Sequence, residues 1–219
     1  MSGAVSHGVD ITIDLVTSGP RCIIATATFG SELAPEVQLL RGFRDNSVME
    51  TVSGSSFMVA FNAWYYSFSP QVANYIATHW VERSVMKLVL YPLVGILALS
   101  YGTFTVASSY PEFAVFLAGI LASSMIGAFY LGLPLSLLRA KIQRLRGTRA
   151  GKLLEMLFGI TLLTGTTALM FGEFVRSPLL LMASSSVVVL SSMLFSAVFV
   201  SKVLLRVTAK RRTIQLRPS

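Results

Sequence analysis

Four long apolar segments are the feature that most limits what this chain can fold into. None of them contains Asp or Lys, and the one acid, Glu155, lies close to the end of its segment. A helix needs roughly 20 apolar residues to cross the hydrocarbon core of a bilayer. We therefore predict a mainly α protein with a four-helix transmembrane bundle. The segments are Leu88–Val106, Phe113–Leu138, Leu153–Phe171 and Pro178–Val200.

Positive charge is concentrated beside these segments. Of the 18 Lys and Arg residues, six lie in Arg139–Lys152 and six in Lys202–Arg217. The connector Ala107–Glu112 has no positive charge, and Gly172–Ser177 has only Arg176. Because cytoplasmic loops carry an excess of Lys and Arg, we expect a multi-pass protein of the cell membrane with both termini in the cytoplasm. The net charge of +8 then indicates contact with membrane lipids rather than with nucleic acid.

The residues before the first span form a predicted head domain, 1–84, ahead of a transmembrane domain, 85–203, and a basic cytoplasmic tail, 204–219. The run "VDITIDLV" at Val9–Val16 alternates with period two, and a second extended run, "CIIATATF", follows it. Alternation with β-branched residues is typical of strands. We therefore predict that the head contains a short strand pair together with amphipathic helices.

The first predicted head helix follows a break at Gly30 and Ser31, where Ser31 is a suitable N-cap. Leu33, Val37 and Leu40 recur at helical spacing and predict its apolar stripe.

An aromatic-rich second head helix is predicted over about Ser53–Tyr66, and a third from Pro70 that continues into the first span. Since Trp and Tyr favour the membrane–water boundary, we assign Trp64, Tyr65 and Tyr66 to that interface.

Cys22 is the only cysteine and the obvious candidate for nucleophilic chemistry. A reactive thiol needs a nearby base or cation, but in a run of small and apolar residues Cys also behaves as a compact core residue. Arg41, Arg44 and Asp45 form a charged helix face, with Arg41 and Asp45 at the favourable i, i+4 spacing. That face is either solvated or docks onto a partner or phospholipid head groups.

A metal site needs several donors, usually three or more His or Cys for zinc or copper. With two His and one Cys in the whole chain, we expect no metal or cofactor bound by this chain alone and no catalytic residue. The serines of the fourth span, in particular Ser184, Ser185 and Ser191, are small enough for close helix contact. We expect them to pack either within this bundle or against a transmembrane partner subunit.

The stretch "CIIATATFGSELAPEVQLLRGFRD", followed by "FNAWYYSFSPQVANYIA" and "LYPLVGIL", resembles the CFI-box domain. The resemblance covers about Arg21 to Leu97, and it departs from the family pattern at Ile23, where Phe is usual. It marks Cys22, Gly30 and Ser31, together with the Arg-Asp pair at Arg44, as motif residues, but the family implies no particular reaction.

The segment "SGSSFMVAFNAWYYSFSP" is similar to CFI-box sequences of ammonia-oxidising archaea. This resemblance implies a non-catalytic accessory subunit of a hetero-oligomeric membrane complex, archaeal ammonia monooxygenase, with copper in the partner subunits. Two alternatives remain open at this point: a Cys22-dependent thiol enzyme or lipid-modified membrane protein, and a small-solute transporter.

Overall fold

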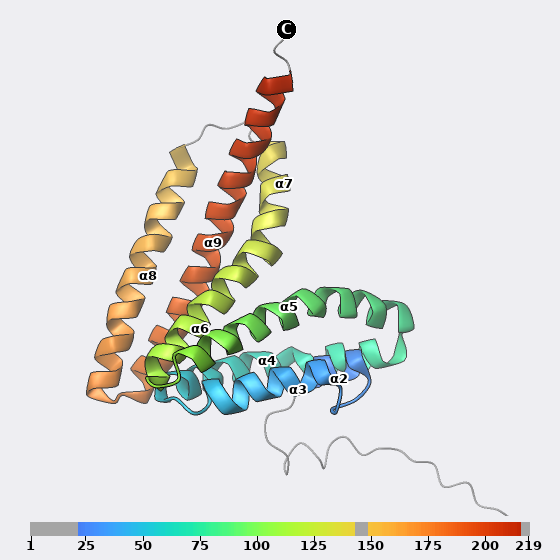
Figure 1. The fold of residues 1–219 in the computed structure, drawn as a ribbon, viewed down its shortest axis with the longest axis vertical. Helices are drawn as coiled ribbons and strands as arrows, with labels where there is room; N and C mark the ends of the chain where they lie inside the picture. Colours follow the sequence, from blue (N-terminus) through green and yellow to red (C-terminus); the bar gives the residue numbers. More distant parts are fainter. Residues whose placement is uncertain (1–21, 143–148, 216–219) are drawn as a thin grey trace, which may run out of the picture.

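The computed structural model describes residues 22–142 and 149–215, and over these ranges the chain is helical, with no strand (Figure 1). The first predicted strand, Val9–Val16, lies outside the described residues. The second predicted strand is wrong, because "CIIATATF" contains helix α2 (Ile23–Phe29). Its buried residues Ala25 and Thr28 are three positions apart, so they share one face of a helix, whereas a strand would place them on opposite faces.

A tight turn joins α2 to α3 (Pro35–Phe43). Gly30 ends α2 with a φ of 84°, a left-handed conformation that favours glycine. The predicted helix cap at Ser31 is wrong: Ala34 is the N-cap and Pro35 is the first helical residue, where its missing N–H costs nothing. The Ser31 hydroxyl instead accepts a hydrogen bond from the Leu33 N–H within the turn (3.0 Å).

The next two helices form an antiparallel pair, α4 (Val52–Thr78) and α5 (Trp80–Val106). A short π-helix, η1 (Arg44–Val48), leads from α3 toward α4. The sequence predicted a helix start at Pro70, but Pro70 lies inside α4. The chain breaks instead at His79, whose backbone is extended (φ −121°).

A bent helical segment follows, made of α6 (Pro111–Ile126), η2 (Gly127–Gly132) and α7 (Leu133–Ile142) (Figure 1). Pro134 is the second residue of α7, and its ring excludes the carbonyl four residues earlier. That carbonyl belongs to η2, whose wider π-helical turn accommodates the clash. The bend therefore lies at Pro134.

The last two helices are α8 (Arg149–Val175) and α9 (Pro178–Gln215). Helix α9 is central, because it packs against α4, α6, η2, α7 and α8. A Cβ on Gly127 would lie 2.0 Å from the carbonyl oxygen of Met193, so only glycine allows η2 to approach α9 this closely. The Ser196 hydroxyl then donates to the carbonyl of Ser124 (2.7 Å).

Four helices are long and apolar enough to cross a membrane, and they overlap the four predicted segments. The prediction of a mainly helical, multi-pass membrane protein is confirmed in this respect, whereas the side on which each terminus lies stays a prediction. The four candidate spans are Trp80–Val106, Pro111–Leu138, Met156–Val175 and Pro178–Val207.

The head helices lie along the first candidate span rather than beyond its end. Val37 of α3 and Leu90 of α5 belong to one buried cluster, and Phe43 of α3 and Phe104 of α5 belong to another. Helices α2 to α5 run alongside one another and crosswise to α8 and α9 (Figure 1). The head and α5 therefore form one helical layer.

Candidate functional site

Cys22, Arg41 and Arg44 lie near one another at the start of α2, whereas Gly30 and Ser31 lie at its other end. The backbone N–H of Ile24 donates to the hydroxyl oxygen of Tyr65 on α4 (3.0 Å). The first N–H groups of a helix have no partner within it, so Tyr65 caps α2 from another helix. Burial, the main cause, raises the pKa of Tyr65 to about 12, which keeps the phenol protonated at neutral pH.

Cys22 sits directly before α2, half-buried against the cluster that contains Ala25 and Val37. Burial is the largest influence on the thiol and raises its pKa, while the positive charges of Arg44 and Arg41 oppose the shift. The balance leaves the pKa raised, so the group is a thiol rather than a thiolate at neutral pH. This geometry favours the packed interpretation of Cys22.

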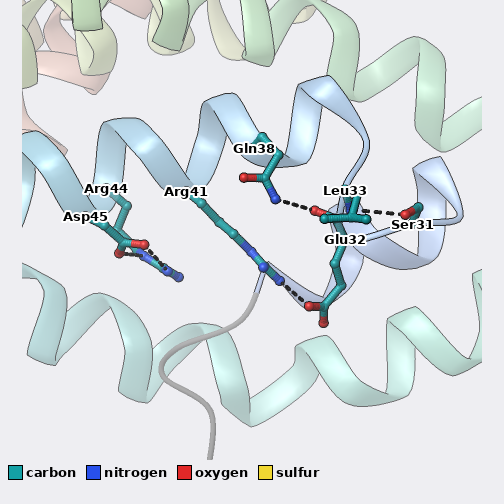
Figure 2. Close-up of polar contacts among 7 residues, drawn as sticks. All are labelled: Ser31, Glu32, Leu33, Gln38, Arg41, Arg44 and Asp45. Carbon is teal, nitrogen blue, oxygen red and sulfur yellow. Dashed lines mark hydrogen bonds and ion pairs between the residues drawn. The ribbon is translucent and has the colours of Figure 1, made fainter.

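Each neighbouring arginine already has a carboxylate partner (Figure 2). Arg44 binds Asp45 through two contacts, Nε–Oδ1 at 2.6 Å and Nη2–Oδ2 at 3.0 Å. Arg41 Nη2 lies 3.1 Å from Glu32 Oε2. The predicted i, i+4 pair between Arg41 and Asp45 is thus replaced by these two pairs. Since both positive charges are balanced, the cluster is not an anion site by charge alone.

The turn before α3 supports the same arrangement. The Gln38 side-chain amide donates to the backbone carbonyl of Glu32 (2.7 Å), which helps to hold the acid near Arg41 (Figure 2). Gly30 and Ser31 shape this turn, and both are exposed. They are structural residues of the turn, whereas Cys22 is half-buried against the cluster with Ala25 and Val37.

The three residues assigned to the membrane interface have different surroundings. The side chain of Trp64 is 62% exposed, as an interface residue requires. Tyr65 points inward to cap α2, and Tyr66 lies close enough to influence the charge on Arg44. The interface assignment therefore suits Trp64 but not Tyr65, because adjacent helical residues project in different directions.

The serines of α9 are buried within this chain. Ser184, Ser185 and Ser191 are only 4–6% exposed, and their hydroxyls donate to carbonyls of their own helix. These contacts agree with the expectation of packing within this bundle, and packing against a partner subunit stays a prediction. The serines have the small size that close packing requires, but the helices packed around α9 belong to the same chain.

Glu112 makes a structural contact that the sequence did not reveal. Its carboxylate accepts hydrogen bonds from the Val52 N–H (2.6 Å), the Ser53 N–H (3.3 Å) and the Ser53 hydroxyl (2.5 Å). Glu112 lies in the first turn of α6, yet it caps the N-terminus of α4, where a negative charge is favourable.

No group of three or more His, Cys, Asp or Glu side chains that could hold a metal ion occurs among residues 22–142 and 149–215. Comparison of the chain with protein-family models, with curated proteins and with solved structures finds no match. The CFI-box resemblance and the link to ammonia-oxidising archaea therefore stay predictions.

Proposed function

We propose that this chain is a non-catalytic accessory subunit of a multi-subunit membrane complex, with archaeal ammonia monooxygenase as the best candidate. The observation that supports it best is the outer face of α8. One face of this helix packs closely on α9, since a Cβ on Gly165 would lie 3.0 Å from Val187. The opposite face has no covering helix in the described part of the chain.

That outer face carries a regular stripe with alternating spacings of three and four residues. In a membrane-spanning helix an exposed apolar face is covered by acyl chains or by a neighbouring helix, and we assign this face to a neighbouring helix. The exposed fractions are large, from 51% at Ile160 to 86% at Phe174. The stripe consists of Leu153, Met156, Ile160, Leu163, Thr167, Met170 and Phe174.

The state of Cys22 supports a structural role over a thiol enzyme. A nucleophilic cysteine works as the thiolate, but burial raises the pKa of this thiol. The nearby arginines are each paired with an acid. On this proposal, copper belongs to partner subunits, and this chain contributes helix surface.

Gentle detergent extraction, native gel separation and mass spectrometry of the co-migrating proteins test the proposal. Co-migration in fixed ratio with copper-containing monooxygenase subunits would support it. Recovery of this chain alone, or only with unrelated transport proteins, would defeat it.

A pair of matched variants connects the result to α8. Leu163→Ala combined with Met170→Ala should release the subunit from the complex while its own stability is unchanged, because both side chains are exposed (68% and 66%). Leu190→Ala combined with Leu194→Ala removes exposed apolar side chains from α9. This control should remain in the complex.

A further inference from the structure

Helix α5 has a continuous exposed face that faces away from the head. Its exposed residues recur at spacings of four and three along the whole helix, and the apolar ones include Leu88 (74% exposed), Leu99 (53%) and Val106 (90%). Two glycines, Gly95 and Gly102, share the same face and are also exposed. The charged residues of α5 lie only in its first turns.

The other face of α5 is covered by α2 and α3. Leu90 joins the cluster with Val37, and Phe104 joins the cluster with Phe43. The ring of Phe43 also meets Tyr101 edge-on, with centroids 6.2 Å apart. Helix α3 therefore runs beside the central and C-terminal parts of α5.

This packing puts ionised groups level with the middle of α5. Arg41 and Arg44 lie between the positions of Val37 and Val48, and the paired acids Glu32 and Asp45 are 44% and 45% exposed. If α5 crossed the bilayer, these partly exposed charges would lie at hydrocarbon depth. Charged side chains at that depth are costly and normally face the interior of a bundle.

The orientation of the layer gives a second, independent indication. Glu112, just after α5, caps the start of α4, so the N-terminus of α4 lies beside the C-terminal end of α5. The whole α2–α5 layer runs crosswise to α8 and α9, near the end where these two helices are joined (Figure 1). Such a layer can rest on one membrane surface while α6–α7, α8 and α9 cross.

We propose that α5 lies in the membrane interface, with its exposed face against the acyl chains of the same bilayer and α2–α4 covering its other face on the water side. Trp80, which is 80% exposed at the start of α5, then anchors that end at head-group level, as interfacial Trp does. The chain crosses three times, and the head lies on the same side as the α5–α6 and α8–α9 turns.

Cysteine labelling at both ends of α5 tests this arrangement. His79→Cys and Ser109→Cys, each made with Cys22→Ser, are treated with a membrane-impermeant maleimide on intact cells and again after permeabilisation. Both positions are exposed, and both should label without permeabilisation. Ser177→Cys provides a control on the Ser109 side, and Ser219→Cys provides the control for the opposite side. Labelling of His79→Cys and Ser109→Cys from opposite sides would overturn the proposal.

A second measurement leaves Cys22 intact. The chain has two tryptophans, so Trp80→Phe leaves Trp64, in the middle of α4, as the single fluorophore. In phosphatidylcholine–phosphatidylglycerol vesicles, its fluorescence should be quenched more by nitroxides near the head group than by nitroxides at the acyl-chain end. Stronger quenching from the chain end would mean that α4 and α5 cross as a hairpin, against the proposal.

Discussion

Replacing Tyr65 by Phe should loosen the start of α2 without disturbing the packing of α4. The substitution keeps the ring and removes the oxygen that accepts the hydrogen bond from Ile24 N–H. A partly buried donor left without a partner costs about 1–3 kcal/mol. The lower part of that range corresponds to roughly a tenfold larger population of locally opened α2, because each 1.4 kcal/mol is a factor of about ten.

The labelling rate of Cys22 reports this opening directly, since Cys22 immediately precedes α2 and is the only cysteine. Purified protein is treated with a maleimide under native conditions, and the rate in Tyr65→Phe should exceed the native rate by up to about tenfold. Tyr91→Phe is the matched control, because its ring also packs against α2, at Phe29 (5.7 Å between centroids), but its side chain is 53% exposed. Equal rates in all three proteins would refute the capping role of Tyr65.

Three further predictions concern stability. Gly127→Ala should destabilise the protein by about 3 kcal/mol through the clash with α9, whereas Gly119→Ala, where a Cβ meets nothing within 4 Å, should leave the thermal midpoint almost unchanged. Glu112→Gln should cost about 1 kcal/mol by weakening the cap of α4, and the exposed Glu50→Gln should cost nothing measurable in the same detergent melt. Burial raises the pKa of the Cys22 thiol, so the thiol stabilises the folded protein below the ordinary thiol pKa, and this stabilisation is lost as the pH rises above about 8.5. Over that range the thermal midpoint of the native protein should therefore fall more than the thermal midpoint of Cys22→Ala.

The apolar segments and the glycine at the end of α2 could be predicted from the sequence because their causes are local. An uncharged run of span length has few alternatives to a helix. Gly30 has no Cβ and therefore suits a left-handed turn, whatever surrounds it. The bend near Pro134 is local in the same sense, since the proline ring clashes within its own helix.

The errors occur where distant parts of the chain decide the outcome. Short apolar runs rich in β-branched residues cannot be assigned to strand or helix by pattern alone, and "CIIATATF" becomes helical where α4 and α5 cover it. The capping of α4 by Glu112 joins residues that are 60 positions apart. The serines of α9 could be recognised as packing residues, but only the fold shows that the packed partners are other helices of the same chain.

The polar cluster around Cys22 and the exposed apolar faces of the molecule lie on different helices. The cluster around Cys22 contains a thiol held protonated by burial, arginines that face acids, and buried polar atoms without a hydrogen-bond partner, among them Thr26 Oγ1 and Arg41 Nε. The exposed faces are instead the outer stripe of α8 and the uncovered face of α5, which carry large apolar side chains. Each of these two exposed faces can be tested separately: release from the complex tests α8, and labelling at both ends tests α5.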